Sequence, residues 1–123
     1  MNIFSDIFIE APGDLNLDAF VRILFPLIGI ERFEERDSSN YVDGTYFRSI
    51  DSPLEVEVCY TDHSGLAAYR FWLSICSEDS TRPAQQAADE FSGILSSHGW
   101  RCFIPQGAWY RNGWNGEGRL YEA

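Results

Sequence analysis

The sequence predicts an α+β fold, in which a mostly antiparallel sheet, built from a four-strand central meander plus terminal strands, carries two helices on one face. Between residues 30 and 76, apolar side chains recur with a period of two, and short polar turns separate the runs. Two segments with helical periodicity flank this region, and a further strand candidate lies near each end of the chain. Because the 123 residues contain no internal repeat or low-complexity linker, we expect residues 1–123 to form one domain.

The first predicted elements are a strand and a largely buried helix. Ile3–Ile9 is rich in β-branched and aromatic residues, which favour strands. Asp14 or Asn16 can cap a helix that begins near Leu15, and Gly29 is a suitable residue to end it. The apolar positions of this helix form a wide stripe at helical spacing: Leu17, Phe20, Val21, Ile23, Leu24 and Leu27.

The meander is predicted from its alternating side chains. Its four strands are Ile30–Arg36, Tyr41–Ile50, Leu54–Tyr60 and Tyr69–Cys76. In the last two strands apolar residues occupy every second position, so one face of the sheet should pack on the helices. The other face then carries two carboxylates, an arginine and a tryptophan: Glu55, Glu57, Arg70 and Trp72. On this face Arg70 is in position to pair with either carboxylate.

A second helix is predicted after the meander. Ser80 or Thr81 can cap it, and Pro83 suits its first turn, where the missing N–H costs least. Gly99 can supply the left-handed residue that ends it. Its apolar stripe contains Ala84, Ala87, Ala88, Phe91, Ile94 and Leu95.

The C-terminal region is predicted to contain a short strand followed by an irregular tail. Trp100–Ile104 is the strand, and Pro105 ends it. The tail is rich in glycine, and we expect Trp109 and Trp114 to pack it on the body of the protein. A last strand is expected near Arg119–Tyr121.

The sequence carries no arrangement typical of an active site. Asp62, His63 and Ser64 offer an acid, a base and a hydroxyl, but adjacent residues on a tight turn cannot align as a relay. We therefore expect a plain turn there, and we expect His98 to contact the last carbonyls of the second helix. The glycines near the C-terminus do not form a phosphate-binding loop, because the required lysine is missing from the whole chain. No catalytic residue and no cofactor is predicted.

The three cysteines lack the close spacing of a structural zinc site. Cys59, Cys76 and Cys102 are 17 and 26 residues apart, and their odd number favours reduced thiols over a disulfide framework. We expect no metal site. One alternative stays open, because Cys59 and Cys76 fall on neighbouring predicted strands and a zinc ion could bind them together with His63.

The predicted compartment is the cytoplasm. The N-terminus has no basic region followed by an apolar stretch, so it does not resemble a signal peptide. The longest apolar stretch, Ala19–Ile30, is interrupted and shorter than the roughly 20 residues that span a bilayer. Together with the reduced thiols, these features predict a soluble cytoplasmic protein without membrane contact.

Acidity is the main guide to partners. Nine arginines face nineteen carboxylates, for a formal charge of −10, which argues against direct nucleic-acid binding. Residues 31–62 alone carry −6, on predicted turns and on the outward face of the meander. This charge serves solubility or attracts a basic partner. Trp72 lies among these outward positions, either as an interface anchor or covered by another element such as the tail.

A small, acidic α+β chain with aromatic-rich loops and no catalytic arrangement resembles bacterial immunity proteins. These proteins neutralise polymorphic toxins, including those of contact-dependent growth inhibition systems. The resemblance implies a non-enzymatic inhibitor that binds the basic C-terminal domain of a cognate toxin, often a nuclease, and masks its active site or its nucleic-acid surface. The residues that we expect to contact the toxin are Asp43, Glu55, Glu57, Asp62 and Trp72.

Two alternatives to an immunity protein remain open. One is a small ligand-binding or regulatory module of a cytoplasmic pathway, in which the sheet and helices enclose a pocket lined by aromatic residues. The other is an enzyme, which would require a residue such as His63 to face a concave pocket.

Overall fold

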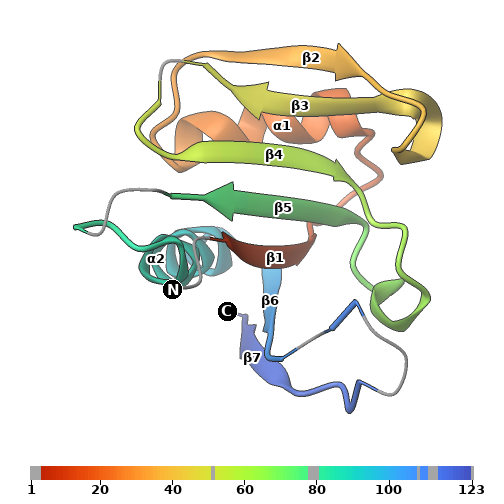
Figure 1. The fold of residues 1–123 in the computed structure, drawn as a ribbon, viewed down its shortest axis with the longest axis vertical. Helices are drawn as coiled ribbons and strands as arrows, with labels where there is room; N and C mark the ends of the chain where they lie inside the picture. Colours follow the sequence, from red (N-terminus) through yellow and green to blue (C-terminus); the bar gives the residue numbers. More distant parts are fainter. Residues whose placement is uncertain (1–3, 51, 78–80, 108, 111–113, 123) are drawn as a thin grey trace.

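A seven-stranded antiparallel sheet forms the body of the protein (Figure 1). The computed structural model describes residues 4–50, 52–77, 81–107, 109–110 and 114–122. The strands are β1 (Phe4–Glu10), β2 (Phe33–Asp37), β3 (Thr45–Ser49), β4 (Glu55–Tyr60), β5 (Phe71–Cys76), β6 (Arg101–Pro105) and β7 (Gly118–Tyr121). The helices are α1 (Leu17–Leu27) and α2 (Ala84–Ser97), with single 3-10 turns η1 (Val42–Gly44) and η2 (Ser64–Leu66).

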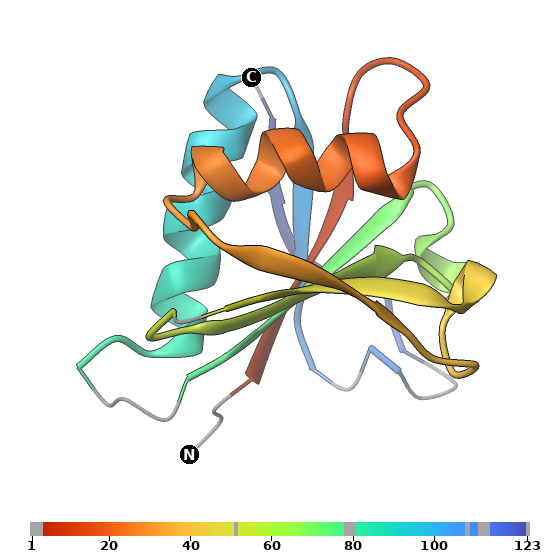
Figure 2. The same cartoon turned by 90° about the horizontal axis from the view of Figure 1, so that it is seen from above.

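The sheet order places the N-terminal strand in the interior of the sheet. The order is β2-β3-β4-β5-β1-β6-β7, and all neighbouring pairs are antiparallel. Strands β2–β5 form the predicted meander, and β1 joins it to the pair formed by β6 and β7. Both helices lie on the same side of the sheet (Figure 2). The predicted α+β fold, with its meander, terminal strands and two helices on one face, is confirmed.

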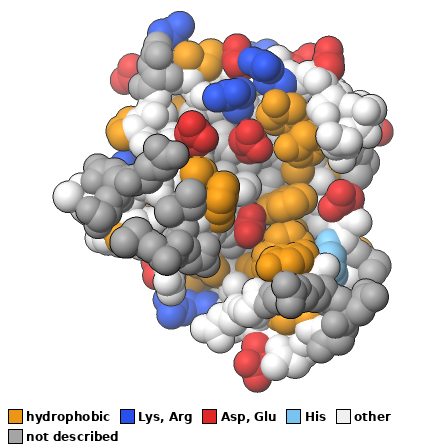
Figure 3. Space-filling view, viewed as in Figure 1, with side chains coloured by type: hydrophobic (Ala, Val, Ile, Leu, Met, Phe, Trp, Pro, Cys, Tyr) orange, Lys and Arg blue, Asp and Glu red, His pale blue; other side chains and the backbone are white. Residues whose placement is uncertain are grey.

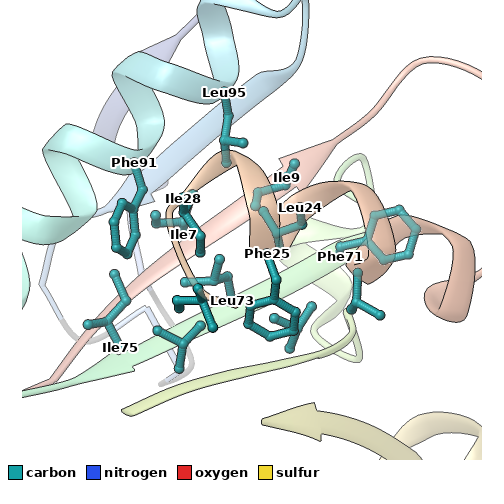
Figure 4. Packing of buried hydrophobic residues seen from close by; sticks show 14 of the residues in the cluster. Ile7, Ile9, Leu24, Phe25, Ile28, Phe71, Leu73, Ile75, Phe91 and Leu95 are labelled. Atoms are coloured by element: carbon teal, nitrogen blue, oxygen red, sulfur yellow. The ribbon is translucent and has the colours of Figure 1, made fainter. Parts of the chain in front are cut away.

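The main core lies between the sheet and the two helices (Figure 4). Ile7 and Ile9 of β1 alternate with side chains on the other face, as do Phe71, Leu73 and Ile75 of β5. These five residues point toward the helices and are buried. Members of this core include Ile7, Ile9, Phe20, Leu24, Phe25, Val56, Val58, Phe71, Leu73, Ile75, Phe91 and Leu95. The Phe20 ring of α1 stacks on the Phe71 ring of β5, with 3.8 Å between centroids. This packing fixes the helices and leaves the opposite face of the sheet to other contacts.

All four predicted strands of the meander are shorter in the structure, and the first two lose the most residues at their starts. The first meander strand begins at Phe33 and not at Ile30, because the Ile30 N–H still donates to the Phe25 carbonyl at the end of α1 (2.9 Å). The second begins at Thr45 and not at Tyr41. Asp43 and Gly44 have φ angles of 62° and 69°, and two consecutive left-handed residues turn the chain and end any strand.

The predicted ends of the helices are largely confirmed. The Asn16 side chain accepts a hydrogen bond from the Ala19 N–H (2.8 Å), so Asn16 and not Asp14 caps α1. Gly29 and Gly99 have φ angles of 80° and 88°, the left-handed conformation predicted after each helix.

The predicted cap of α2 is wrong. Pro83 occupies the N-cap position, with φ −60° and ψ 146°, and no side chain makes a capping hydrogen bond there. Thr81 lies two residues before that position, which is too early in the chain for a cap, and Ser80 lies outside the described residues. Neither α1 nor α2 has the length and apolar character needed to cross a bilayer, and the described part of the chain holds no other α-helix.

Candidate functional site

The helix-free face of the sheet is the candidate site (Figure 3). We use this name for the side chains that alternate with the main core. They are Glu34, Arg36, Tyr46, Arg48, Glu55, Glu57, Cys59, Trp72, Ser74, Cys76, Phe4, Asp6, Phe8 and Phe103. Figure 1 views this face with α1 behind the strands, and Figure 3 shows hydrophobic side chains gathered on it beside acidic and basic ones.

One half of this face carries a second apolar cluster. Phe8, Leu66 and Trp109 are buried in it, and Tyr69, Trp72, Phe103 and Trp114 pack against them. We call these seven residues the aromatic cluster. Trp109 comes from the C-terminal tail, and its ring lies edge-on to Phe8 and Trp72, with centroids 5.0 and 5.2 Å apart. The prediction that Trp109 and Trp114 pack the tail on the body is therefore confirmed.

Trp72 lies on the helix-free face, as the alternation predicts. Its ring stacks on Phe8 (5.7 Å between centroids), and Trp109 covers part of it, so the side chain is half-buried. Trp72 is therefore partly covered by the tail, as one of the two interpretations predicts, and its role as an interface anchor stays a prediction.

Asp6 bonds to two tryptophans of the aromatic cluster and was not among the residues predicted for the site. Its Oδ1 accepts the indole N–H of Trp72 (2.8 Å), and its Oδ2 accepts the indole N–H of Trp109 (3.2 Å). A half-buried carboxylate with two indole donors joins β1, β5 and the tail. The available signal was an aspartate in the middle of an otherwise apolar strand, since such a group needs hydrogen-bond donors when it is covered.

The meander half of the face is polar. Glu34 of β2 forms an ion pair with Arg36 (2.9 Å) and lies 4.0 Å from the guanidinium of Arg48 on β3. Beside them, Tyr41 and Tyr46 stack with 4.4 Å between ring centroids. These groups form a charged and aromatic border along the outer strands of the sheet.

Tyr41 connects this border to the carboxylates of β4. Its hydroxyl donates to the Glu57 carboxylate (3.4 Å). Partial burial, followed by the charge of Glu57, raises the pKa of Tyr41 to about 12. Tyr41 thus remains a neutral hydrogen-bond donor at physiological pH.

Three of the predicted contact residues come together on two neighbouring strands. Glu55 is exposed on β4 opposite Cys76 of β5, and Glu57 is half-buried opposite Ser74. Trp72 follows on the same face of β5. The small side chains of Ser74 and Cys76 leave the two carboxylates accessible on this side.

The other two predicted contact residues lie away from this group. Asp62 is exposed in the loop after β4. Asp43 is exposed on η1 and lines a shallow hollow of about 570 Å³ that it shares with Tyr60, Tyr69 and Glu10. Asp43 therefore contributes to a different surface from Glu55 and Glu57.

The predicted pairing of Arg70 with these glutamates is wrong. Arg70 precedes β5, and its Nη1 donates to the Asp14 carboxylate (2.9 Å) and the Leu15 carbonyl (3.0 Å) before α1. The partner lies 56 positions earlier in the chain and could not be identified from strand alternation. Within the described residues, Glu55 and Glu57 form no ion pair with an arginine. Arg48 of β3 is nevertheless the register partner of Glu57 on the same face, so Glu57 has a cationic neighbour although no ion pair joins them.

His63 takes part in a turn, as predicted. Its Nδ1 accepts the Gly65 N–H (3.2 Å) at the start of η2. Its ring lies edge-on to Trp109, with 5.5 Å between centroids. The imidazole thus supports the loop that covers the aromatic cluster.

The strand register separates the possible zinc ligands. Cys59 lies opposite Trp72 and Cys76 lies opposite Glu55, at the two ends of the β4–β5 pair, so this alternative set is not assembled. Over the described ranges, no three residues of the ligand types come together. Burial raises the pKa of Cys59 and of Cys102 to about 12, so both thiols are neutral at physiological pH. None of the three cysteines forms a disulfide.

The face as a whole carries carboxylates, two arginines and aromatic surfaces. The space between the sheet and the helices is filled by the main core. The chain matches no protein-family model, no curated protein and no solved structure.

Proposed function

We propose that the protein is a non-enzymatic immunity protein that binds and neutralises a cognate basic toxin domain, in keeping with the resemblance of its sequence. The helix-free face is the contact surface in this proposal. The observation that carries it is the pair Glu55 and Glu57, which share one face of β4 with no arginine partner among the described residues. Arg48 lies opposite Glu57 across the β3–β4 pair, but no ion pair joins them. The two carboxylates on this helix-free face therefore favour a cationic partner.

Electrostatics supports a basic partner in particular. The chain has a formal charge of −10, and a field of this sign accelerates association with a basic domain and disfavours acidic ones. If the toxin is a nuclease, its active site attracts phosphates, and carboxylates on this face occupy the place of those phosphates. Glu55 and Glu57 are the groups to which we assign this role.

Aromatic side chains supply the apolar part of the proposed contact. Tyrosine and tryptophan dominate the energetics of many protein interfaces. The stacked rings of Tyr41 and Tyr46 lie on one side of the glutamates, and the accessible part of Trp72 lies on the other. A partner that bridges these groups would gain buried apolar area as well as ion pairs.

A double charge reversal tests the proposal. Glu55→Arg/Glu57→Arg should weaken binding to the basic toxin domain encoded beside this protein by at least about tenfold at low ionic strength, since close interfacial charge pairs contribute more than 1.4 kcal/mol. Binding of the parent protein should weaken as salt increases. Isothermal titration calorimetry at two salt concentrations measures both effects.

The matched control lies on the helix side of the same sheet. Glu35 and Asp37 are exposed on β2 and belong to the opposite face, because Glu35 pairs with the buried Phe47. Glu35→Arg/Asp37→Arg changes the net charge by the same amount and should change the affinity only slightly. Equal losses for the two double variants, or binding that does not depend on salt, would contradict a specific role for the helix-free face.

A further inference from the structure

A hollow of about 380 Å³ lies at the end of the helix-free face, where β1, β6 and the tail meet. Phe4, Trp109 and Tyr110 line it with aromatic rings, and Asp6 lines it with a carboxylate. Tyr110 and Phe4 are the most exposed large hydrophobic side chains of the described residues, at 64% and 54%. Both line this hollow, so it presents exposed aromatic surface beside a carboxylate.

The Asp6 carboxylate keeps hydrogen-bonding capacity in this hollow. A carboxylate has about four lone-pair sites, and the two indole donors occupy one on each oxygen. Indole N–H groups are neutral, so they satisfy the oxygens without neutralising the charge. In the described part of the chain, Asp6 forms no ion pair.

The strand register places two residues of this hollow on the same face as the glutamates of β4, two strands away. Phe4 and Glu55 both lie opposite Cys76, and Asp6 and Glu57 both lie opposite Ser74. Each pair is therefore two strands apart, or about 10 Å, with one small side chain between them.

We propose that this hollow binds a cationic side chain of a protein partner, and that the side chain is an arginine. The planar guanidinium stacks on aromatic rings and donates two parallel hydrogen bonds to a carboxylate, whereas a lysine ammonium does neither as well. Phe4, Trp109 and Tyr110 provide the rings, and Asp6 provides the acceptor. The assignment of this arginine to a toxin rests on the proposed function. The binding of an arginine side chain by the hollow does not depend on it.

A small probe tests the hollow without any partner. N-acetyl-arginine amide is titrated into the full-length protein, and N-acetyl-citrulline amide, a neutral molecule of nearly the same shape, is the control. Nitrogen-15 NMR follows the four indole N–H signals. The Trp72 and Trp109 signals report on Asp6, and those of Trp100 and Trp114 are internal references because their indoles do not bond to Asp6.

Three variants separate the contributions of the Asp6 carboxylate, the Tyr110 ring and the overall charge to binding of the arginine probe. Asp6→Asn should raise the dissociation constant of the arginine probe by about tenfold, the effect of losing a hydrogen bond to a charged acceptor. Tyr110→Ala should raise it about threefold by removing one ring. Because Tyr110 contacts the Trp109 ring edge-on (5.8 Å between centroids), the Trp72 and Trp109 signals of this variant are first compared with the parent protein without probe, to check that both bonds to Asp6 remain. Asp37→Asn removes one charge on the helix side of β2 and should leave the dissociation constant unchanged.

The expected result is a saturable shift of the Trp72 and Trp109 signals with the arginine probe and none with citrulline. Equal shifts with both probes, or unchanged binding by folded Asp6→Asn and Tyr110→Ala, would overturn the proposal. If Asp6→Asn does not fold, the dissociation constant of the arginine probe for Tyr110→Ala tests the proposal by itself. Toxin binding that is sensitive to Glu55 and Glu57, without an arginine response in the hollow, would refute only the present inference. An arginine response without toxin binding would refute only the proposed function.

Discussion

The indole N–H of Trp109 donates to the carboxylate of Asp6, 103 positions earlier in the chain, at 3.2 Å. Trp72 donates to the other oxygen of the same carboxylate at 2.8 Å. Asp6 lies opposite Ser74 in the β1–β5 pair, so backbone pairing with β5 fixes its position, while the pairing of β1 with β6 begins two residues later at Phe8. The carboxylate therefore determines where the tail lies on the sheet, and with it the shape of the hollow beside Tyr110.

Replacing the Trp109 indole tests this attachment. Trp109→Phe keeps a ring in the aromatic cluster but removes the donor, and should lower the free energy of unfolding by about 1–2 kcal/mol. Trp109→Ala also removes the buried ring and should cost about 3–5 kcal/mol. Urea unfolding measures both. Trp114→Phe is the control, because its indole donates to the neutral Gln106 carbonyl at an exposed site and the expected loss is smaller than for Trp109→Phe.

A buried serine connects β3 to the start of β4. The Ser49 hydroxyl accepts the Val56 N–H (3.0 Å) and donates to the Leu54 carbonyl (3.2 Å). Ser49→Ala leaves both backbone groups without this partner and should lower the free energy of unfolding by about 1–3 kcal/mol. Ser97→Ala, which removes an exposed hydroxyl at the end of α2, should change it by less than about 0.5 kcal/mol. Similar effects of the two substitutions would be evidence against the assigned role of Ser49.

Replacing each of two glycines by alanine should change the free energy of unfolding in opposite directions. A Cβ atom at Gly118 would lie against the Phe103 ring and 2.5 Å from the Ile104 carbonyl oxygen. Gly118→Ala should therefore separate β7 from β6 and cost about 1–3 kcal/mol. Gly93 lies inside α2 with no atom within 4 Å of the added Cβ, so Gly93→Ala should raise stability by about 0.5–1 kcal/mol. Thermal unfolding distinguishes the two signs directly.

Burial of two thiols predicts a loss of stability in alkali. The pKa of Cys59 and of Cys102 is about 12 in the folded protein, against an ordinary value of 9.0. Between these values the unfolded chain loses protons that the folded protein keeps, so the free energy of unfolding falls as the pH rises from about 9 toward 12. Below about pH 9 both states hold the protons, and these groups cause no pH dependence.

Unfolding in urea between pH 8 and 10.5 checks this sign. The slope should approach about 1.4 kcal/mol per pH unit for each ionising thiol, and Cys59→Ala should reduce it whatever its effect at pH 8. At pH 8, a thiol reagent should modify Cys59 and Cys102 only after unfolding. Rapid modification of either residue in the native protein would show that its thiol is more accessible than the structure indicates.

The order of the elements could be predicted because its signals are local. Alternation with a period of two identifies each strand of the meander, and glycines mark the ends of both helices. The start of β3 could not be predicted, since Asp43 is a non-glycine residue in the left-handed region. The order of strands in the sheet was also out of reach, because β1 pairs with segments that lie far along the chain.

For the candidate site, the face on which residues lie could be predicted, but the partners from distant parts of the chain could not. Alternation places Glu55, Glu57 and Trp72 on one face of the sheet, and the structure has them there. Arg70 was assigned to the same face, but its partner Asp14 comes from the loop before α1. Asp6 was missed because its two donors are 66 and 103 positions away, and no local pattern carries that information.

The interior position of β1 also bears on how the chain folds during synthesis. β1 is synthesised before the other strands of the sheet, yet its residue Phe8 pairs with Trp72 of β5 and with Phe103 of β6. The hairpins of β2–β5 connect neighbours in sequence and can form as they are made, whereas β1 waits for its partners. During that time both faces of an apolar strand are uncovered, and the nascent chain is most open to chaperone binding or aggregation.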